Sequence, residues 1–387
     1  MLSFYRQFLF EGVVPFWLKH GIDRVHGGLL TCMDETGNPV SSEKFAWSQG
    51  RGIWAFAAIH RRLSPDPELL EIAERTAEFC LAHAILADGR VCFRMSRSGE
   101  VLEGHTSVYA DLFLAYGLNE LYLATGTRRY RDEALRLFRQ SAAEIRQPYF
   151  NTIAPYALPP GTAWVHGPPM IALETANELL EGGEESDVAD FIDWALERIM
   201  VRHRRPEWET LIEHLGPSDE FVDTPPGRAV VPGHAIESMW FVIHAASRRG
   251  RPDLEGQAIE VIRWMLEAGW DAEYGGIFLG LDSHGRQPTW YANADKKLWW
   301  VHCEALYALA LCRRLRPEPW VEEWSGRVLD WSLAHHGDGR GEWIQRLDRE
   351  GKPIKELIAL PVKDPFHLPR ALTLSIQLLS HTHPYVR

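Results

Sequence analysis

Cysteine is scarce in this sequence, and the few cysteines show no paired spacing. Cys32, Cys80, Cys92, Cys303 and Cys312 form an odd number, with no CxxC pair among them. Such a set is typical of neither a disulfide framework nor a zinc knuckle. We therefore expect a reducing, cytoplasmic compartment.

Long apolar runs are also missing. No stretch approaches the roughly 18 uncharged apolar residues that a membrane-spanning helix needs, so we expect no membrane association. Residues 1–21 are apolar but contain Arg6, Glu11 and Lys19, and they lack the basic start and small-residue cleavage site of a secretory signal. We predict a helix there instead.

Basic charge is in deficit. Lysine and arginine number 41 against 53 acidic residues, which gives a net charge of -12. Nucleic-acid binding rests on a basic surface, so nucleic-acid partners are excluded and polyanionic substrates disfavoured. A single local basic pocket for one anion remains compatible with this balance.

Several motifs of bound nucleotides and covalent catalysis are absent. The sequence has no GxxxxGK[ST] phosphate loop, no GxGxxG after a strand and no GxSxG elbow. We therefore expect no required cofactor, and the sequence gives no support to ATP or another nucleotide as a modulator. A serine or cysteine hydrolase is disfavoured on the same grounds.

A repeated phrase is the most informative feature that is present. HGGLLTCMDETGNP at 26–39 and YGGIFLGLDSHGRQP at 274–288 share two glycines, an apolar alternation and Asp-x-x-Gly. Weaker copies lie at 88–102 and 341–353. The pattern predicts short β-hairpins with glycine-bearing turns, and its recurrence indicates a repeat architecture.

Apolar residues spaced three and four apart predict about twelve helices. We place them at 3–19, 44–63, 66–85, 105–125, 127–147, 166–182, 185–203, 233–249, 251–269, 294–315, 317–335 and 366–382. Short linkers alternate with long ones of roughly 18 to 30 residues, too long for structureless loops. Six antiparallel pairs put all long linkers, with their hairpins, at one rim. The periodicity fits an (α/α)6 barrel or an open α-solenoid as a single domain, 1–387.

Residues with reactive or polar side chains lie near the starts of the even-numbered predicted helices, which follow the long linkers. They are Trp47, Gln49 and Arg51; His105 and Tyr109; His234 and Glu237; Lys297, Trp300 and Glu304; and His367 and Arg370. If these helices form an inner ring, the residues converge on one basin under the rim. Helix N-termini there also offer free N–H groups to an oxyanion.

Each residue also has a structural interpretation. A single histidine among 17 is more often structural than catalytic. Arg51 and Arg370 fit buried ion-pair partners of Glu304 or Glu237 as well as they fit substrate ligands. His302 is offset by two from Glu304, so we interpret it as structural.

The sequence predicts no metal site. His234 and Glu237 stand three apart on one helical face, a spacing that metals do use. There is, however, neither an HExxH motif nor a second histidine at helical spacing.

Nine sequence blocks follow one another in a characteristic order: HGGLLTCMDETG, WSQGRGIW, GLNELYLATG, PPMIALETANEL, PGHAIESMWF, WDAEYGGIF, KKLWWVHCEAL, GEWIQRLDREG and FHLPRAL. In this order and spacing the chain resembles, over nearly its whole length, the N-acylglucosamine 2-epimerase family, also known for renin-binding protein. The resemblance implies an all-α (α/α)6 barrel, a sugar in the central basin and interconversion of the C2 epimers of an N-acylated hexosamine. By the same resemblance the essential residues are Arg51, His234, Glu304, His367 and Arg370.

Elementary chemistry agrees with this reaction. Epimerisation at C2 removes the proton alpha to the C1 carbonyl of the open sugar and returns one to the opposite face. Two histidines with pKa values near neutrality suit that task, and His234 and His367 start different even-numbered helices. Arg51 or Arg370 would stabilise the enediolate oxygen. Glu304 would fix a histidine tautomer or help open the ring.

Substrate recognition is predicted from the remaining candidates. Aromatic side chains such as Trp47 and Trp300 would pack on the C–H face of the sugar. Met170 stands where cellobiose-epimerase relatives place histidines, which disfavours a disaccharide. The chain departs from N-acyl members at His105–Thr106 and at residues 359–365.

Alternatives therefore remain open. One is an epimerase or aldose–ketose isomerase for unmodified mannose or glucose. Another is an α/α-barrel glycoside hydrolase with Asp111 and Glu304 as its carboxylates. A third is a non-catalytic helical binding module. The expected partner is a monosaccharide, and a homodimer is compatible with the sequence.

Overall fold

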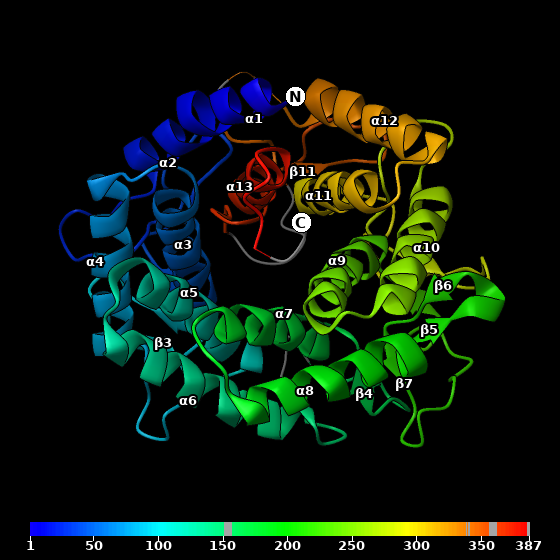
Figure 1. Ribbon diagram of the computed structural model, residues 1–387, viewed down its shortest axis with the longest axis horizontal. Coiled ribbons are helices and arrows are strands. Elements are labelled where there is room, and N and C mark those ends of the chain that lie inside the picture. Colours follow the sequence, from blue (N-terminus) through cyan, green and yellow to red (C-terminus); the bar gives the residue numbers. More distant parts are fainter. Residues whose placement is uncertain (151–156, 338, 340, 356–361, 385–387) are drawn as a thin grey trace.

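The computed structural model consists of two concentric rings of helices (Figure 1). It describes all residues except 151–156, 338, 340, 356–361 and 385–387. The inner ring contains α3 (Ala46–Ala58), α5 (Val108–Thr125), α7 (Gly167–Glu181), α9 (Pro232–Arg249), α11 (Trp299–Leu315) and α13 (His367–Leu379). The outer ring contains α1 (Leu2–Gln7), α2 (Val14–His20), α4 (Pro67–His83), α6 (Arg128–Ile145), α8 (Ser186–Glu197), α10 (Pro252–Gly269) and α12 (Pro319–His335).

Three π-helical turns extend these helices. They are Phe8–Val13, which joins α1 to α2, Ile59–Leu63 after α3 and Arg198–His203 after α8. The twelve predicted helices are thus present, and the even-numbered predicted helices lie inside. Because α13 packs against α11, α3 and α1, the ring closes. The prediction of an (α/α)6 barrel is confirmed, and the open solenoid is excluded.

Two predicted helix starts need correction. The helix predicted from 105 begins at Val108, because Ser107 caps it by accepting a bond from the Tyr109 N–H. The helix predicted from 294 begins at Trp299, since Lys297–Leu298 form a strand instead. In both places the residue just before the helix, Ser107 or Leu298, has an extended backbone.

The two rings differ as their positions demand. Nearly every residue of α5 through its first three turns is buried, whereas α6 buries one face and exposes Arg128, Arg129 and Arg139 on the other. All five cysteines are buried and unpaired. Among the described residues, none of the helices is both long enough and apolar enough to span a membrane.

Two glycines allow inner helices α3 and α5 to approach closely. A Cβ added at Gly50 would lie 2.4 Å from the carbonyl oxygen of Phe113, and one added at Gly117 would lie 2.3 Å from that of Gly50. Real Cβ atoms do not come so near backbone atoms. Gly50 and Gly117 therefore set the spacing of the two helices that carry Arg51 and Tyr109.

Gly50→Ala should consequently destabilise the fold. The added methyl must push α3 from α5, and overpacking of this kind costs about 1 to 3 kcal/mol. The free energy of unfolding in urea measures this. Gly326→Ala in α12, where an added Cβ meets nothing within 4 Å, is the control and should be neutral or stabilising. Equal stability of the two variants would contradict the close-packing argument.

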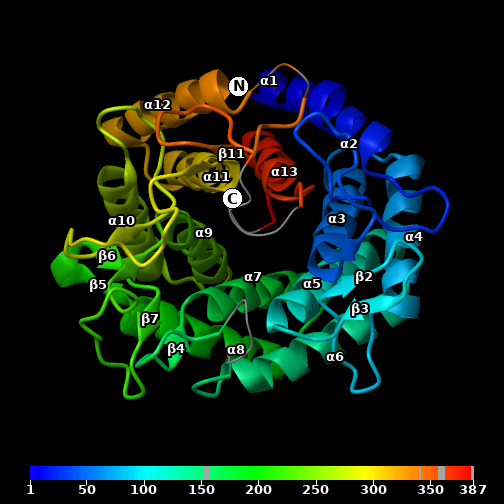
Figure 2. The same ribbon diagram turned by 180° about the vertical axis from the view of Figure 1, so that it is seen from behind.

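Short strands in the long linkers form the rim. Figure 2 shows the molecule from the side opposite to that of Figure 1. The strands are β1 (Lys44–Phe45), β2 (Arg94–Met95), β3 (Val101–Glu103), β4 (Trp164–Val165), β5 (Arg204–Arg205), β6 (Thr210–Leu211), β7 (His214–Leu215), β8 (Ala229–Val230), β9 (Leu281–Asp282), β10 (Lys297–Leu298) and β11 (Arg346–Leu347).

Most of this pairing joins successive linkers. β1 pairs β2, β4 pairs β7, β8 pairs β9 and β10 pairs β11, all antiparallel. Within single linkers, β2–β3 and β5–β6 are hairpins, and single antiparallel bridges join Met33 to Pro39 and Leu347 to Pro353 across the Asp-x-x-Gly turns of the phrases at 26–39 and 341–353. Three of the four phrases thus contain the predicted short hairpin turn. In addition, the strands that pair between linkers join neighbouring helix pairs, and we call this set of strands the rim lattice.

The first copy of the phrase is an anchor for the rim. Asp23 accepts bonds from the N–H groups of Val25 and His26, and its other oxygen accepts a bond from Nζ of Lys44 at 3.0 Å. Lys44 also donates to the carbonyl of Gly27 at 2.6 Å. A buried ion pair thus ties the double-glycine turn to the strand that leads into α3.

The second copy repeats this arrangement. Asp271 accepts bonds from the N–H groups of Glu273 and Tyr274, and Lys297 donates to Asp271 at 3.1 Å and to the carbonyl of Gly275 at 2.8 Å. Lys297, which the sequence placed among substrate-binding residues, is fully buried in this anchor. The phrase recurs because two helix pairs use the same anchor.

A further side chain completes each anchor. The N–H of Leu29 donates to Oε1 of Gln49 at 2.6 Å, and the N–H of Ile277 donates to Nε2 of His302 at 3.0 Å. Gln49 and His302 each follow the anchoring lysine by five positions. Gln49, expected at the sugar, therefore supports the backbone, and His302 is structural as predicted.

Candidate active site

A cavity of about 510 Å³ opens under the rim, and every inner helix contributes to its lining. Of the predicted site residues it contains Trp47 and Arg51 from α3, Tyr109 from α5, Met170 from α7, His234 and Glu237 from α9, Trp300 from α11 and His367 from α13. The convergence follows from the fold, because six inner helices start at the same end of the barrel.

The two histidines both pack against one indole. The ring centroid of Trp300 is 5.3 Å from that of His234 and 5.7 Å from that of His367. Both imidazoles also line the cavity. A small molecule held in the cavity against Trp300 would contact both rings.

His234 has an acidic neighbour from the rim. Its Nδ1 lies 3.3 Å from each carboxylate oxygen of Glu213, in the two-residue link between β6 and β7. Burial opposes a charge on the imidazole, but the Glu213 carboxylate outweighs it, so the pKa of His234 is raised. The ring is therefore biased toward its protonated form.

His367 is biased the other way. Burial and the nearby Arg51 guanidinium lower the pKa of His367 to about 3. Its Nδ1 lies 2.6 Å from Oε1 of Glu304, and its Nε2 lies 3.6 Å from Asp364. Because the Nδ1–H group donates a hydrogen bond to Glu304, the neutral ring carries its lone pair on Nε2.

Arg51 is both an ion-pair partner and a cavity residue. It donates to Asp364 at 2.5 Å, and its guanidinium lies 3.9 Å from the ring centroid of Phe113 and 4.7 Å from that of Trp47. The predicted ion pair is therefore present, but the partner of Arg51 is Asp364 and not Glu304 or Glu237. A fixed positive charge stands beside His367 at the cavity wall.

Arg370 belongs to a buried cluster behind the lining. It donates to Glu237 and, at 2.8 Å, to Glu304, whose second oxygen accepts the indole N–H of Trp240 at 2.8 Å. Arg370 and Glu304 are both at least 98% buried and absent from the cavity lining. For Arg370 the structural interpretation therefore fits, and Glu304 acts on the site through His367.

The acidic part of this cluster has the composition of a metal site. Glu237, Glu304 and His367 offer ligand atoms within 4.8 Å of one another. The Arg370 guanidinium, however, donates to both carboxylates and already supplies the neutralising charge. A divalent cation there would have to face that charge.

His105 lies outside the cavity lining. Its Nε2 is 3.0 Å from Arg90 and its Nδ1 contacts the carbonyl of Val91. Asp111 holds the same arginine and accepts the Val91 N–H, so it is absent from the lining too. The proposed hydrolase pair of Asp111 and Glu304 therefore does not flank the cavity.

Sequence reasoning missed the polar residues that the rim contributes. Glu213, Asp364, Tyr291 and Gln345 all line the cavity from the long linkers. Asp364 had a recognisable signal, since it lies three residues before the start of the inner helix α13. Glu213 had none, because its relation to His234 depends on pairing between linkers.

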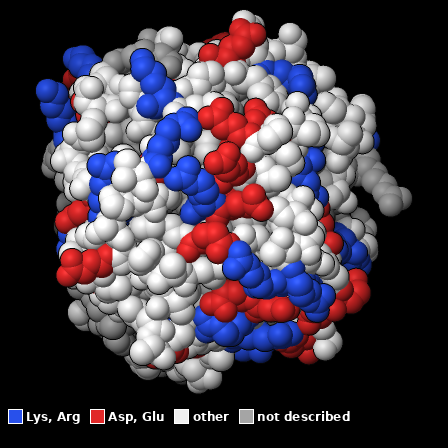
Figure 3. All heavy atoms as spheres, turned by 90° about the vertical axis from the view of Figure 1, so that its left-hand side faces the viewer, with Lys and Arg blue, Asp and Glu red and all other residues white. Residues whose placement is uncertain are grey.

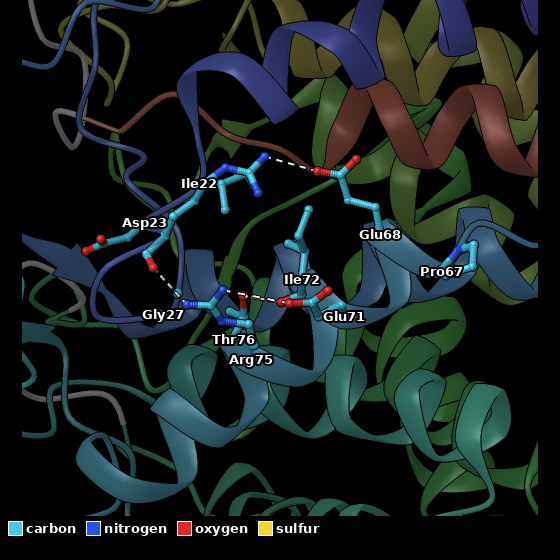
Figure 4. Close-up of a pocket in the computed structure, with 11 residues that line it drawn as sticks. Ile22, Asp23, Gly27, Pro67, Glu68, Glu71, Ile72, Arg75 and Thr76 are labelled. Atoms are coloured by element: carbon cyan, nitrogen blue, oxygen red, sulfur yellow. Dashed lines mark hydrogen bonds and ion pairs between the residues drawn. The ribbon is translucent and has the colours of Figure 1, made fainter.

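A second cavity of about 310 Å³ lies at the outer wall, between the first long linker and α4 (Figure 4). Its charged side chains satisfy one another: Arg24 pairs with Glu68 at 3.0 Å and Arg75 with Glu71 at 3.8 Å. On this side of the molecule, basic and acidic side chains are intermixed (Figure 3). The cavity beneath the rim is therefore the stronger candidate for chemistry.

Comparison with known proteins gives a consistent result. A family model described as N-acylglucosamine 2-epimerase (GlcNAc 2-epimerase) matches residues 27–371. The N-acylglucosamine 2-epimerase of Bos taurus is 30% identical over 379 residues, covering 96% of this chain and 89% of that protein.

Solved structures agree on the fold. A cellobiose 2-epimerase from Bacillus thermoamylovorans B4167 superposes with a TM-score of 0.83 at 20% identity, over 97% of this chain and 98% of that one. A D-mannose isomerase superposes with a TM-score of 0.80 at 14% identity, over 98% of both chains. With the sequence match covering most of its length, this chain belongs to the N-acylglucosamine 2-epimerase family.

Proposed function

We propose that this protein is an isomerase that interconverts N-acyl-D-glucosamine and N-acyl-D-mannosamine at C2. The observation that carries the proposal is the pair of histidines on one indole, with pKa values displaced in opposite directions by their neighbours. Titratable groups held in opposite protonation states are what an acid and a base require. Family membership supplies the substrate class.

The roles follow from the protonation states. With the open-chain sugar between the rings, neutral His367 accepts the C2 proton at Nε2. The electron pair of the C2–H bond forms a C1=C2 double bond, and the C1 carbonyl becomes the negative oxygen of an enolate. Arg51, at the same wall, stabilises the negative oxygen. Protonated His234 then delivers a proton to the opposite face of C2, and the carbonyl reforms. The reverse reaction uses the opposite protonation of the pair.

This chemistry needs no metal and no other cofactor. The imidazoles move the protons, and a guanidinium supplies the fixed charge. We also propose that any nucleotide effect would be modulatory, that the protein acts in the cytoplasm, and that a homodimer is compatible with an active site built within one chain.

The function is tested by a proton NMR time course in D₂O, with N-acetylmannosamine and mannose in one tube. We expect N-acetylglucosamine bearing deuterium at C2, because the proton returned to C2 exchanges with solvent on the histidine. Conversion of mannose alone, to glucose or fructose, would move the substrate to an unmodified sugar while keeping the histidine pair. No change in either sugar would contradict the proposal.

A further inference from the structure

We propose that Glu213 is a positioning residue for this reaction, which holds the Nδ1 edge of His234 from the rim so that Nε2 of that ring faces the cavity as the proton donor. The inference rests on the proposed function for its chemical meaning. Its structural part, that Glu213 controls the ionisation of His234, can be tested without any substrate.

The contact between Glu213 and His234 has the geometry of a carboxylate that holds the imidazole ring in place, an arrangement called the clamp below. Both carboxylate oxygens of Glu213 lie 3.3 Å from the same nitrogen of His234, so the carboxylate faces the ring edge symmetrically. Glu213 is 2% exposed, so water screens the interaction little. On the far side Nδ1 of His166, a fully buried ring, lies 3.6 Å from Oε1 of Glu213.

The rim lattice fixes Glu213 itself. Its N–H donates to the carbonyl of Ala229, and its carbonyl accepts the N–H of His166, both at 2.9 Å. The adjoining residue His214 belongs to β7, which pairs β4. Three segments of the rim therefore hold this carboxylate in place, which a residue on a free loop would not achieve.

The charges around His234 support the assignment. Glu213 from the rim and Glu237 from the same helix favour its protonated form, while Arg51 from α3 opposes it. Of these, Glu213 has the largest influence after burial, and its own pKa stays well below the ordinary value because His234 and His166 face it against the cost of burial. Glu213 is thus ionised whenever His234 is charged.

The second histidine is held in the same way by a different element. His367 presents its Nδ1 to Glu304 of α11, and His234 presents its Nδ1 to Glu213 of the rim. Each ring is therefore left with Nε2 for the substrate. The rim lattice therefore takes part in the reaction, because it carries the residue that positions His234.

The test is an NMR titration of the His234 ring in the free protein with labelled histidine, assigned by the signal lost in His234→Asn. In Glu213→Gln we expect the His234 midpoint to move to lower pH, because the favourable charge is gone. We expect kcat to fall by roughly 10- to 100-fold, as for other outer positioning residues. The high-pH limb of the rate profile should move in the same direction, since the donor must be protonated.

Glu207→Gln, an exposed carboxylate in the same linker, is the matched control and should leave midpoint and kcat unchanged. If Glu213→Gln does not fold, the midpoint is read in Glu213→Asp, whose shorter side chain withdraws the carboxylate from the ring and should also lower it. An unchanged His234 midpoint in a folded Glu213 variant would overturn the inference. A shifted midpoint in a protein without epimerase activity would reject the proposed function and leave the clamp standing.

Discussion

His367→Asn is expected to reduce kcat by roughly 10² to 10⁴-fold, the usual contribution of a positioned acid or base, with no loss of fold. Asparagine still offers an N–H to Glu304, so the buried cluster keeps a partner for that carboxylate. It has no basic ring nitrogen that can take up a proton, so proton transfer at one face of C2 is lost. His234→Asn should have an equal effect at the other face.

Deuterium exchange makes this prediction sharper. In a two-base reaction each histidine removes the C2 proton of one epimer only. A variant that lacks one histidine should therefore still exchange the C2 proton of the epimer that the remaining histidine deprotonates, without converting that epimer into the other. The two variants should retain exchange in opposite epimers. Substantial epimerisation in either variant would remove the two-base mechanism.

The matched control is His302→Gln. His302 is fully buried, and its Nε2 accepts the Ile277 N–H in the second rim anchor. The chain itself uses Gln49 for the same task in the first anchor. This variant should therefore keep both turnover and stability, which separates loss of a catalytic histidine from loss of a buried one.

Arg370→Leu is expected to give the largest loss of stability, about 3 to 5 kcal/mol in the free energy of unfolding. The leucine leaves the carboxylates of Glu237 and Glu304 buried together without the guanidinium that both accept from. Removing one member of such a cluster costs more than the pairs themselves contribute, because uncompensated charge stays in the interior. Urea unfolding at neutral pH measures the effect.

Arg263→Leu is the control for a surface pair. Arg263 contacts Glu267 at 2.8 Å, but both side chains are about half exposed, so its loss should cost under about 1 kcal/mol. A similarly small loss for Arg370→Leu would contradict the buried-cluster interpretation. It would then point to a role for Arg370 at the substrate.

Much of the architecture could be predicted because it depends on short-range pattern. Apolar spacing predicts each helix, and residues that start or end helices, such as Pro67 and Gly126, predict the helix boundaries to within a few residues. Alternation of short and long linkers then forces the pairs to be antiparallel and puts the reactive helix starts at one end. His234 and His367 are in one cavity for that reason.

Other predictions failed where a residue's partner lies far away in sequence. Gln49 and Lys297 were expected at the sugar because polar side chains at inner helix starts suggest a site. Their partners, Leu29 and Asp271, belong to the preceding turns, and only the folded rim brings them within bonding distance.

The sequence by itself determined the helix pairs, their direction and the set of side chains that face the basin, since periodicity and linker length act locally. Only the tertiary structure decided which of those side chains are free for a substrate and how their charges are set. Glu213 meets His234 and Arg51 meets Asp364 across linkers that pair through backbone hydrogen bonds. Such pairing carries no local signature, yet it places the Glu213 carboxylate that raises the pKa of His234.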